Sequence, residues 1–200
     1  MLKSRNDAQA LLAWGEAQNP GKWAAHSRTV ARAAETIANA AGLDGERAYI
    51  SGLLHDIGRY EGATGLHHVY AGYSLLRREG FDDIAAICLS HSLPNREFAE
   101  GSGEADFTPE ELKAVIDYLK NTEYNDYDKL IQLCDALGTD GGIVLMEKRL
   151  VDVTRRYGFS SYTLPKWNKL FEIKQYFDGL ISGNVYGLFG DEIGRVTFED

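Results

Sequence analysis

The sequence lacks the marks of secreted and membrane-spanning proteins. It contains only two cysteines, Cys88 and Cys134, and both lie in apolar helical patterns, so we expect buried free thiols in a reducing compartment. No apolar run approaches a membrane-spanning length, and residues 1–7 lack the apolar core of a signal peptide. We therefore expect a soluble, cytoplasmic protein with no membrane partner.

An excess of positive charge is also missing. The formal net charge is -9 at pH 7, whereas a protein that binds a phosphate backbone normally carries a basic face, so we expect no nucleic-acid polymer as a partner. A small anionic substrate is compatible with this charge, because a bound divalent metal reverses the local field. The 200 residues, of which 44% are hydrophobic, suffice for a sizeable core.

Convincing strand patterns, repeats and low-complexity tracts are absent, and helical signals run through almost the whole chain. We predict an all-α fold in which residues 1–140 form the core and residues 141–200 a C-terminal extension packed on it. The expected helices cover 6–18, capped by Asn6 or Asp7, then 22–41, 45–57, 68–79, 82–92, 109–120, 126–137, 142–157 and 165–181. The polar segment 94–107, with Gly101 and Gly103, is the best candidate for a mobile lid. Residues 183–200 give no clear assignment.

Two adjacent metal-capable residues, His55 and Asp56, end one apolar run. Neighbours on a helix point about 100° apart, so both can face inward only if most of the helix is buried. A buried carboxylate is costly without a cation or good donors. Gly58 would then end the helix in the left-handed conformation.

Further metal-capable residues lie on apolar helical faces. His26 shares a face with Val30, and His91 closes the buried stripe of its helix. Asp135 stands inside the apolar run 130–137. Each of them alone is as well explained by a core histidine bonded to a carbonyl or by a salt-bridged aspartate. Together they form a ligand set that suits Fe, Mn, Zn, Ni or Mg.

His67 and His68 begin the helix expected at 68–79. His68 has Gly72 one turn later on its own face, and a glycine there lets another backbone or a metal site approach closely. His67 points to a different face and is expected in a loop or at the surface.

The order His26, His55-Asp56, Asp135 resembles the HD superfamily of metal-dependent phosphohydrolases over about residues 22–137. His68 and His91 resemble the further ligands of its two-metal subset. The resemblance implies an HD-domain helical bundle that holds two divalent ions, iron first, with Mn, Ni, Zn or Mg as alternatives. It would place one ion on His26, His55, Asp56 and Asp135, and the other on Asp56, His68 and His91.

The resemblance implies that a hydroxide held at the metals hydrolyses a small phosphorylated substrate. A nucleotide or a dinucleotide is the favoured substrate. Asp56 would position the hydroxide and could accept its proton. Arg59 could bind a phosphate oxygen, or could pair with Glu61 at the surface. Asn95 and Arg96 could touch the substrate, although a solvated loop is the simpler interpretation of both.

Two other functions stay open. The six-ligand arrangement also resembles the di-iron HD oxygenases typified by myo-inositol oxygenase, which often have a lysine soon after the doublet, where this chain has Arg59. A non-catalytic, ligand-sensing HD module is the third hypothesis. The helices after Gly138 could cover the pocket or form the face of a homodimer.

The central prediction concerns metal content. His55→Ala and Asp56→Ala should each lose bound metal and activity, because each removes a ligand from the middle of the site. Elemental analysis of the purified variants measures this, and full metal content in either one would contradict the assignment.

The pair His67 and His68 supplies the matched control. His67→Ala should be close to neutral, whereas His68→Ala should lose metal. An equally large loss in His67→Ala would show that the other member of the pair is the ligand.

Overall fold

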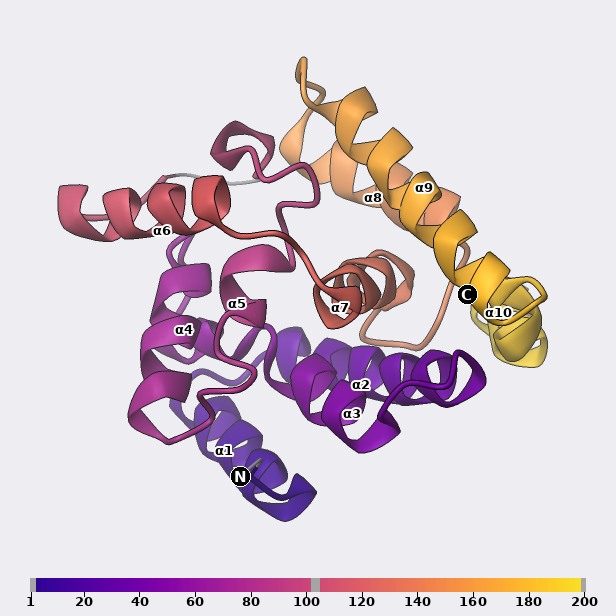
Figure 1. The fold of residues 1–200 in the computed structure, drawn as a ribbon, viewed down its shortest axis with the longest axis horizontal. Coiled ribbons are helices and arrows are strands. Elements are labelled where there is room, and N and C mark those ends of the chain that lie inside the picture. Colours follow the sequence, from indigo (N-terminus) through magenta and orange to yellow (C-terminus); the bar gives the residue numbers. More distant parts are fainter. Residues whose placement is uncertain (1–2, 102–104, 199–200) are drawn as a thin grey trace.

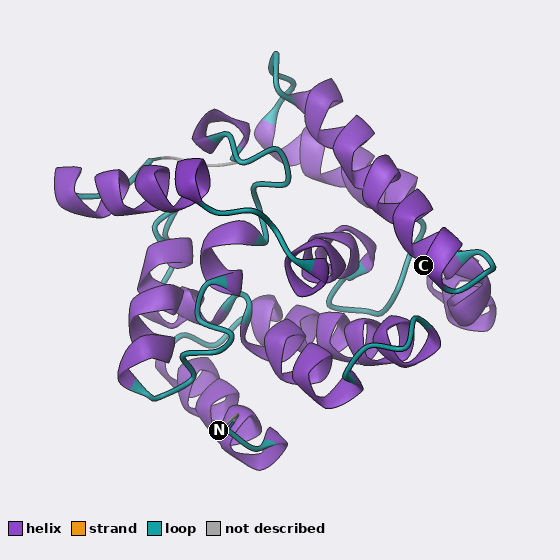
Figure 2. Ribbon diagram, in the orientation of Figure 1, coloured by secondary structure: helices purple, strands orange, loops and turns teal. Residues whose placement is uncertain are grey.

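The chain folds as a bundle of helices (Figure 1). The computed structural model describes residues 3–101 and 105–198, and within them it contains helices joined by loops and no strand (Figure 2). The elements are α1 (Arg5–Gln18), α2 (Lys22–Ala40), α3 (Gly45–Leu54), η1 (Ile57–Glu61), α4 (His68–Arg78), α5 (Ile87–Ser90), η2 (Phe98–Glu100), α6 (Pro109–Asn121), α7 (Asp126–Leu137), α8 (Met146–Tyr157), α9 (Thr163–Leu180), η3 (Val185–Phe189) and α10 (Gly190–Phe198). The predicted all-α class is confirmed.

Helix α7 lies at the centre of the bundle. It is seen nearly end-on in Figure 1, with α2 and α3 below it and α9 beside it, and it also packs against α5 and α8. Its sequence explains this position, because buried residues occupy almost every face of the helix, from Asp128 to Leu137. A central α7 brings Asp135 next to the ends of several other elements.

The C-terminal part of the chain packs on the same core as the N-terminal part. Leu170 and Phe177 of α9 and Val185 of η3 belong to one cluster of buried side chains with Leu12 of α1 and Ile37 of α2. Residues 185–198, which had no assignment from the sequence, form η3 and α10. The division of the chain at residue 140 stays a prediction.

Helix starts follow their capping residues. Thr108 caps α6 in a capping box with Glu111, as its sequence predicts. The cap of α1 is Ser4, and not Asn6 or Asp7. The Ser4 side chain accepts a hydrogen bond from the backbone N–H of Asp7, and the Asp7 carboxylate accepts one from the backbone N–H of Ser4. The helix expected at 82–92 is the short α5 preceded by turns, and this places His91 at its C-cap.

The segment predicted as one helix over 45–57 is two elements. Helix α3 ends at Leu54, His55 is its C-cap, and Asp56 precedes the 3-10 helix η1 with φ -106° and ψ 13°. This bridge conformation is common at functional sites. Both side chains face inward at this break, since His55 is 1% and Asp56 5% exposed.

Gly58 does not end a helix in the left-handed conformation, since it is absent from the described glycines of positive φ. Its role is a close approach of backbones instead. A Cβ at Gly58 would lie 1.9 Å from the carbonyl oxygen of His68 and 2.5 Å from the backbone nitrogen of Gly72. The predicted close approach at Gly72 is present too, because a Cβ there would lie 3.1 Å from the nitrogen of Gly58. The two glycines therefore let η1 and α4 touch, and they set His68 beside Asp56.

No helix within the described residues has the length and apolar character needed to cross a membrane.

Gly58→Ala should destabilise the fold strongly. The new methyl group meets backbone atoms that cannot rotate away, so we expect a loss of about 3 kcal/mol or more in the free energy of unfolding. For a chain of this size that corresponds to a fall of about 6–12 °C in melting temperature, measured by differential scanning calorimetry.

Gly179→Ala is the matched control. A Cβ at Gly179, near the end of α9, meets no atom within 4 Å, so alanine should be neutral or stabilise the helix by up to about 1 kcal/mol. Equal stability of the two variants would contradict the packing role of Gly58.

Candidate metal centre

Three histidines enter the site from the ends of three helical segments. His55 is the C-cap of α3, His68 is the first residue of α4, and His91 is the C-cap of α5. In each ring Nδ1 lies at hydrogen-bond distance from a carbonyl oxygen three residues earlier: 2.7 Å from Gly52 for His55, 2.8 Å from Gly65 for His68 and 2.9 Å from Cys88 for His91. A carbonyl only accepts, so Nδ1 carries the proton and donates it.

This tautomer leaves Nε2 of each neutral ring as a lone-pair donor. Nε2 of His55 and Nε2 of His68 are buried and have no hydrogen-bond partner. Burial lowers the pKa of His55 to about 4 and that of His68 to about 3, so both rings are neutral at pH 7. A histidine ring binds a metal when it is neutral and when a carbonyl fixes its orientation, and both conditions hold here.

Asp56 lies among these rings. Its Oδ1 is 3.3 Å from Nε2 of His68 and 3.5 Å from Nε2 of His91, and its Oδ2 accepts a hydrogen bond of 2.7 Å from Nε of Arg59. Burial by itself would raise the pKa of Asp56, but the Arg59 charge holds it well below its usual range. The carboxylate is therefore ionised, and its buried Oδ1 lacks a hydrogen-bond partner.

His26 and Asp135 complete the cluster from α2 and α7. Nε2 of His26 is 2.9 Å from Oδ1 of Asp135, and Nε2 of His55 is 3.9 Å from the same oxygen. Against the effect of burial, His26 and the other histidines lower the pKa of Asp135. No arginine takes the place of a metal here, since both ion-pair partners of the Asp135 carboxylate within the described chain are histidines.

Two groups of donor atoms have the spacing of a metal site. His26, His55 and Asp135 form one, and His55, Asp56 and His91 form the other, and in each group the ligand atoms lie within 4.8 Å of one another. The groups share His55, and His68 approaches the second through Asp56. Nitrogen and carboxylate donors with unpartnered buried atoms fit divalent transition metals.

A buried polar network fixes α5 on α7 behind the cluster. Oγ of Ser90 donates to Oδ1 of Asp128 at 2.6 Å, and Nε2 of Gln132 donates to the carbonyl of Ser90 at 2.9 Å. Burial raises the pKa of Asp128. These bonds hold the residue next to His91 and thereby fix the position of the His91 ring relative to Asp135.

Five of the six residues proposed as ligands line a cavity of about 650 Å³: His26, Asp56, His68, His91 and Asp135. Helices α2, α7, α8 and α9 and the segment around η1 line it, so the helices after Gly138 do contribute to the pocket. Cationic groups are frequent in its wall: Lys22, Arg59, Arg149, Arg156 and Lys166. Lys22 is neutralised by Asp140 at 2.9 Å.

The profile of the HD domain matches residues 23–140, more than half of the chain. The chain belongs to the HD-domain family. Proteins of this family are usually metal-dependent hydrolases of the phosphohydrolase superfamily. No curated protein and no solved structure matches the chain. All six residues proposed as ligands lie within the matched HD domain.

Arg59 faces the HD-domain cluster and does not pair with Glu61. Its Nε contacts Asp56, and its side chain is 31% exposed and lines the cavity. Glu61 instead contacts Nδ1 of His67 at 3.1 Å. His67 also approaches Glu111. Neither His67 nor His68 belongs to the two ligand groups, but Nε2 of His68 lies 3.3 Å from Asp56, and the choice of His68 as the ligand stays a prediction.

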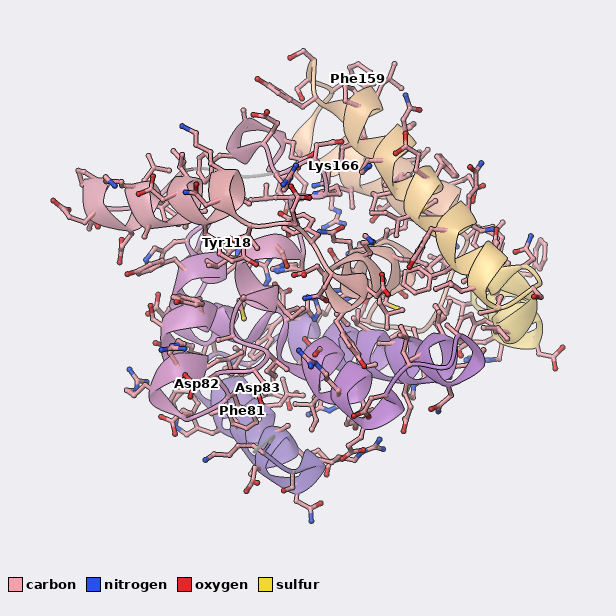
Figure 3. All side chains as sticks on the ribbon, viewed as in Figure 1. Phe81, Asp82, Asp83, Tyr118, Phe159 and Lys166 are labelled. Atoms are coloured by element: carbon pink, nitrogen blue, oxygen red, sulfur yellow. The ribbon has the colours of Figure 1, made fainter. Side chains whose placement is uncertain are left out.

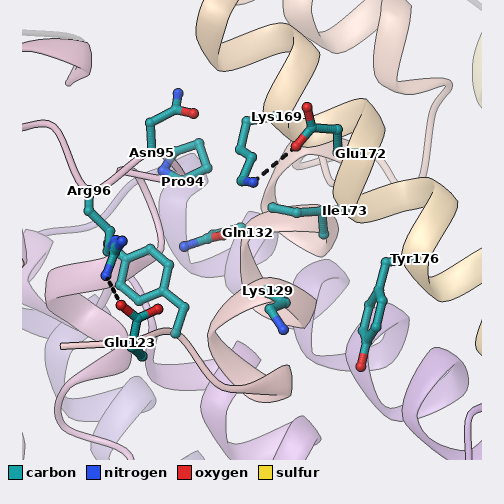
Figure 4. A pocket seen from close by; sticks show the side chains of 11 residues that line it. Pro94, Asn95, Arg96, Glu123, Lys129, Gln132, Lys169, Glu172, Ile173 and Tyr176 are labelled. Atoms are coloured by element: carbon teal, nitrogen blue, oxygen red, sulfur yellow. Dashed lines mark hydrogen bonds and ion pairs between the residues drawn. The ribbon is translucent and has the colours of Figure 1, made fainter.

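Asn95 and Arg96 lie away from the HD-domain cavity. They line a second pocket of about 390 Å³ with Tyr124, Gln132 and Tyr176 (Figure 4). Asn95 donates two hydrogen bonds of 2.7 Å to Glu100, and Arg96 contacts Glu123 at 2.8 Å. Their sequence proximity to His91 does not place them in the same cavity, and their contact with a substrate stays a prediction.

The segment predicted as a lid is partly built into the fold. Within 94–101, η2 carries Glu100, which is 4% exposed and is held by Asn95. Residues 105–107 are also described, whereas Gly103 lies outside the described residues.

Sequence reasoning missed the cavity residues of the C-terminal helices. Nζ of Lys166 donates to the carbonyl of Ser92 at 2.8 Å, from the side of α9 that faces the segment after α5 (Figure 3). Burial lowers the pKa of Lys166. No local signal separates Lys166 from Lys169, because only the packing of α9 decides which lysine reaches the cavity.

Removal of metal should destabilise the HD domain. At a metal concentration about 100-fold above Kd, binding to the folded state contributes about 2.7 kcal/mol. Chelation should therefore lower the melting temperature by about 5–11 °C, measured with and without chelator. His55→Gln, which removes the ligand shared by both groups, should show no chelator-dependent shift; a full shift in this variant would place the metal elsewhere.

Proposed function

We propose that this HD domain is a metal-dependent phosphohydrolase that cleaves a phosphoester or phosphoanhydride of a small metabolite, with a nucleotide or dinucleotide as the favoured substrate. One observation carries the proposal. A buried cluster of unpartnered histidine nitrogens and ionised carboxylates opens into a cavity whose wall also carries several cations. Metal-capable residues and cations that could bind a phosphate therefore line one space of about 650 Å³.

The proposed cofactors are two divalent ions, iron being favoured and Mn, Ni, Zn or Mg the alternatives. His26, His55 and Asp135 would hold one ion, and His68 and His91 the other, with Asp56 between them. When bound, the ions supply Lewis acidity toward a phosphoryl oxygen and acidify a water molecule near neutral pH.

Asp56 and Arg59 are the proposed catalytic residues of the protein itself. Oδ2 of Asp56 is occupied by Nε of Arg59, whereas its Oδ1 is unpartnered and could take a proton from the attacking water. This bond fixes the orientation of the carboxylate. The terminal nitrogens of Arg59, in the wall of the cavity, could bind a phosphoryl oxygen and orient the substrate.

The side chains that flank ligand positions are poor nucleophiles here. Oγ of Ser90 is bonded to Asp128, and neither Ser51 nor Ser90 lines the cavity. Burial raises the pKa of the Cys88 thiol, which keeps it protonated. Attack by water, rather than by one of these side chains, is therefore the proposed step.

The test is a screen of phosphorylated metabolites with the metal-loaded protein. We expect release of orthophosphate from at least one nucleotide or dinucleotide, abolished by chelation and restored by metal. Asp56→Asn should lower the rate by at least about 100-fold, since even residues that only support a metal ligand cost about 10–100-fold. Asp82→Asn, at an exposed aspartate paired with Arg77, is the matched control and should keep full activity.

The alternative oxygenase function makes a different prediction. Bound iron that consumes dioxygen in the presence of substrate, with no phosphate released across the screen, would overturn the proposed hydrolase. A ligand that binds without turnover of either kind would favour the sensing module. A homodimer stays a prediction from the sequence.

A further inference from the structure

Helix α8 presents one face to the cavity that the proposed metal ligands line. Its cavity residues are Arg149, Asp152, Val153, Arg156 and Tyr157, and their spacing of three, four, seven and eight positions is that of a single helical face. Met146 and Leu150 of the same helix are buried instead. A wall of this kind faces solvent or a polar ligand, and here it faces the cavity that holds the proposed metal ligands.

Arg149 lacks the partners that a partly buried guanidinium requires. Its side chain is 19% exposed, and its Nε is buried without a hydrogen-bond partner. Among the described residues its ion-pair partner is Asp152, at 3.7 Å from Nη1, which is longer than a hydrogen bond. Asp152 is shared with Arg156, which it contacts at 3.0 Å. Two arginines and one carboxylate leave a net positive charge at this wall.

Lys166 adds a third cation from α9. Its Nζ donates to two neutral acceptors, the carbonyls of Ser92 at 2.8 Å and of Glu100 at 3.5 Å, and no ion pair of Lys166 is recorded within the described chain. Ser92 follows the proposed ligand His91. The ammonium group is therefore held at the edge of the metal cluster with its charge uncompensated by a contacting carboxylate.

We propose that Arg149, Arg156 and Lys166 form a second anion subsite, so that the substrate carries a further phosphoryl group beside the one that is cleaved. This inference rests on the proposed function and narrows its substrate class to bis-phosphorylated molecules, such as nucleoside polyphosphates, dinucleotide polyphosphates or bisphosphates. The cleaved group would lie at the metals and Arg59, and the second group at the cations of α8 and α9. Asp152 keeps the two arginines apart and oriented in the absence of the anion.

The subsite comes from outside the matched HD domain. The family profile ends at residue 140, whereas all three cations lie on α8 and α9. The metal side of the cavity and its second anion side are therefore built by different parts of the chain. A monophosphate would leave Arg149 with only its long contact to Asp152 and Lys166 with only two carbonyls, which is a costly arrangement for partly buried charges.

The experiment measures binding of phosphonates, whose C–P bonds resist hydrolysis, to the metal-loaded protein. Ethylene-, propylene- and butylenediphosphonate cover different separations of the two anionic groups, and propylphosphonate is the single-anion reference. Titration calorimetry should show at least one diphosphonate binding about tenfold or more tightly than propylphosphonate, as expected for one added set of charge-assisted hydrogen bonds. Equal affinity for all four compounds would overturn the proposal.

Variants assign the difference to the subsite. Lys166→Gln and Arg149→Gln should each remove most of the preference for the diphosphonate and leave the affinity for propylphosphonate within about twofold. The matched controls are Lys169→Gln, on α9 but in the wall of the other pocket, and Arg155→Gln, an exposed neighbour of Arg156. Both controls should keep the preference. A variant that weakens both ligands equally, or controls that lose as much, would contradict a second subsite.

The outcomes also separate this inference from the proposed function. If no phosphate ester is hydrolysed but the diphosphonate preference follows the variants as expected, the subsite stands and the hydrolase proposal falls. If esters are hydrolysed and no preference exists, the hydrolase proposal stands and the subsite falls. Melting temperatures of Lys166→Gln and Arg149→Gln, compared with their controls, show whether each variant is folded.

Discussion

A carboxylate buried where three helical segments end must have positive charge or donors beside it, and the structure around Asp56 follows from that requirement. Asp56 is 5% exposed and its carboxylate is ionised. Arg59 contacts one carboxylate oxygen, and histidine nitrogens surround the other. The rings cannot supply that charge themselves, because burial keeps His55 and His68 neutral at pH 7. Arg59 alone compensates one oxygen. The remaining oxygen and the unpartnered nitrogens together call for a cation, which is why a metal suits this cluster better than any rearrangement of its own hydrogen bonds.

The backbone geometry that gathers these residues was only partly predictable. The sequence showed helices well where apolar periodicity and caps agree, as in the helix 126–137 and the capping box at Thr108. It could not show that the helix carrying His55 ends at Leu54, because Ile57 stands three and four positions after Leu54 and Leu53, as in a continuous helix. The predicted left-handed conformation of Gly58 is wrong. Local chain preferences suggest a left-handed stop, but the constraint is the contact with α4, which only the tertiary structure contains.

The metal-capable residues and the cations of the cavity also differ in how far the sequence predicts them. Candidate metal ligands can be identified in the sequence because a polar, metal-capable residue on an apolar helical face conflicts with its surroundings, as Asp135 does within 130–137. Cations at a cavity wall produce no such conflict, since Arg149 and Lys166 stand in polar helices where any lysine or arginine is ordinary. Asn95 shows that closeness in the chain does not fix which pocket a residue lines. It follows His91 closely in the chain, yet the turn after α5 directs it toward Glu100 and the second pocket.

Charge distribution explains how an acidic protein could handle an anionic substrate. The chain carries a formal charge of -9, so at long range it repels phosphates, and attraction has to be created locally. Bound divalent ions would do this on the HD-domain side, because they outweigh the carboxylates that hold them. In the same cavity α8 and α9 add arginines and a lysine whose charges exceed that of Asp152. A cavity with positive charge both at the proposed metals and at these cations, within an acidic surface, selects for ligands with more than one anionic group. A singly charged ligand can satisfy only one of the two, and it gains nothing from the rest of the surface to offset the repulsion.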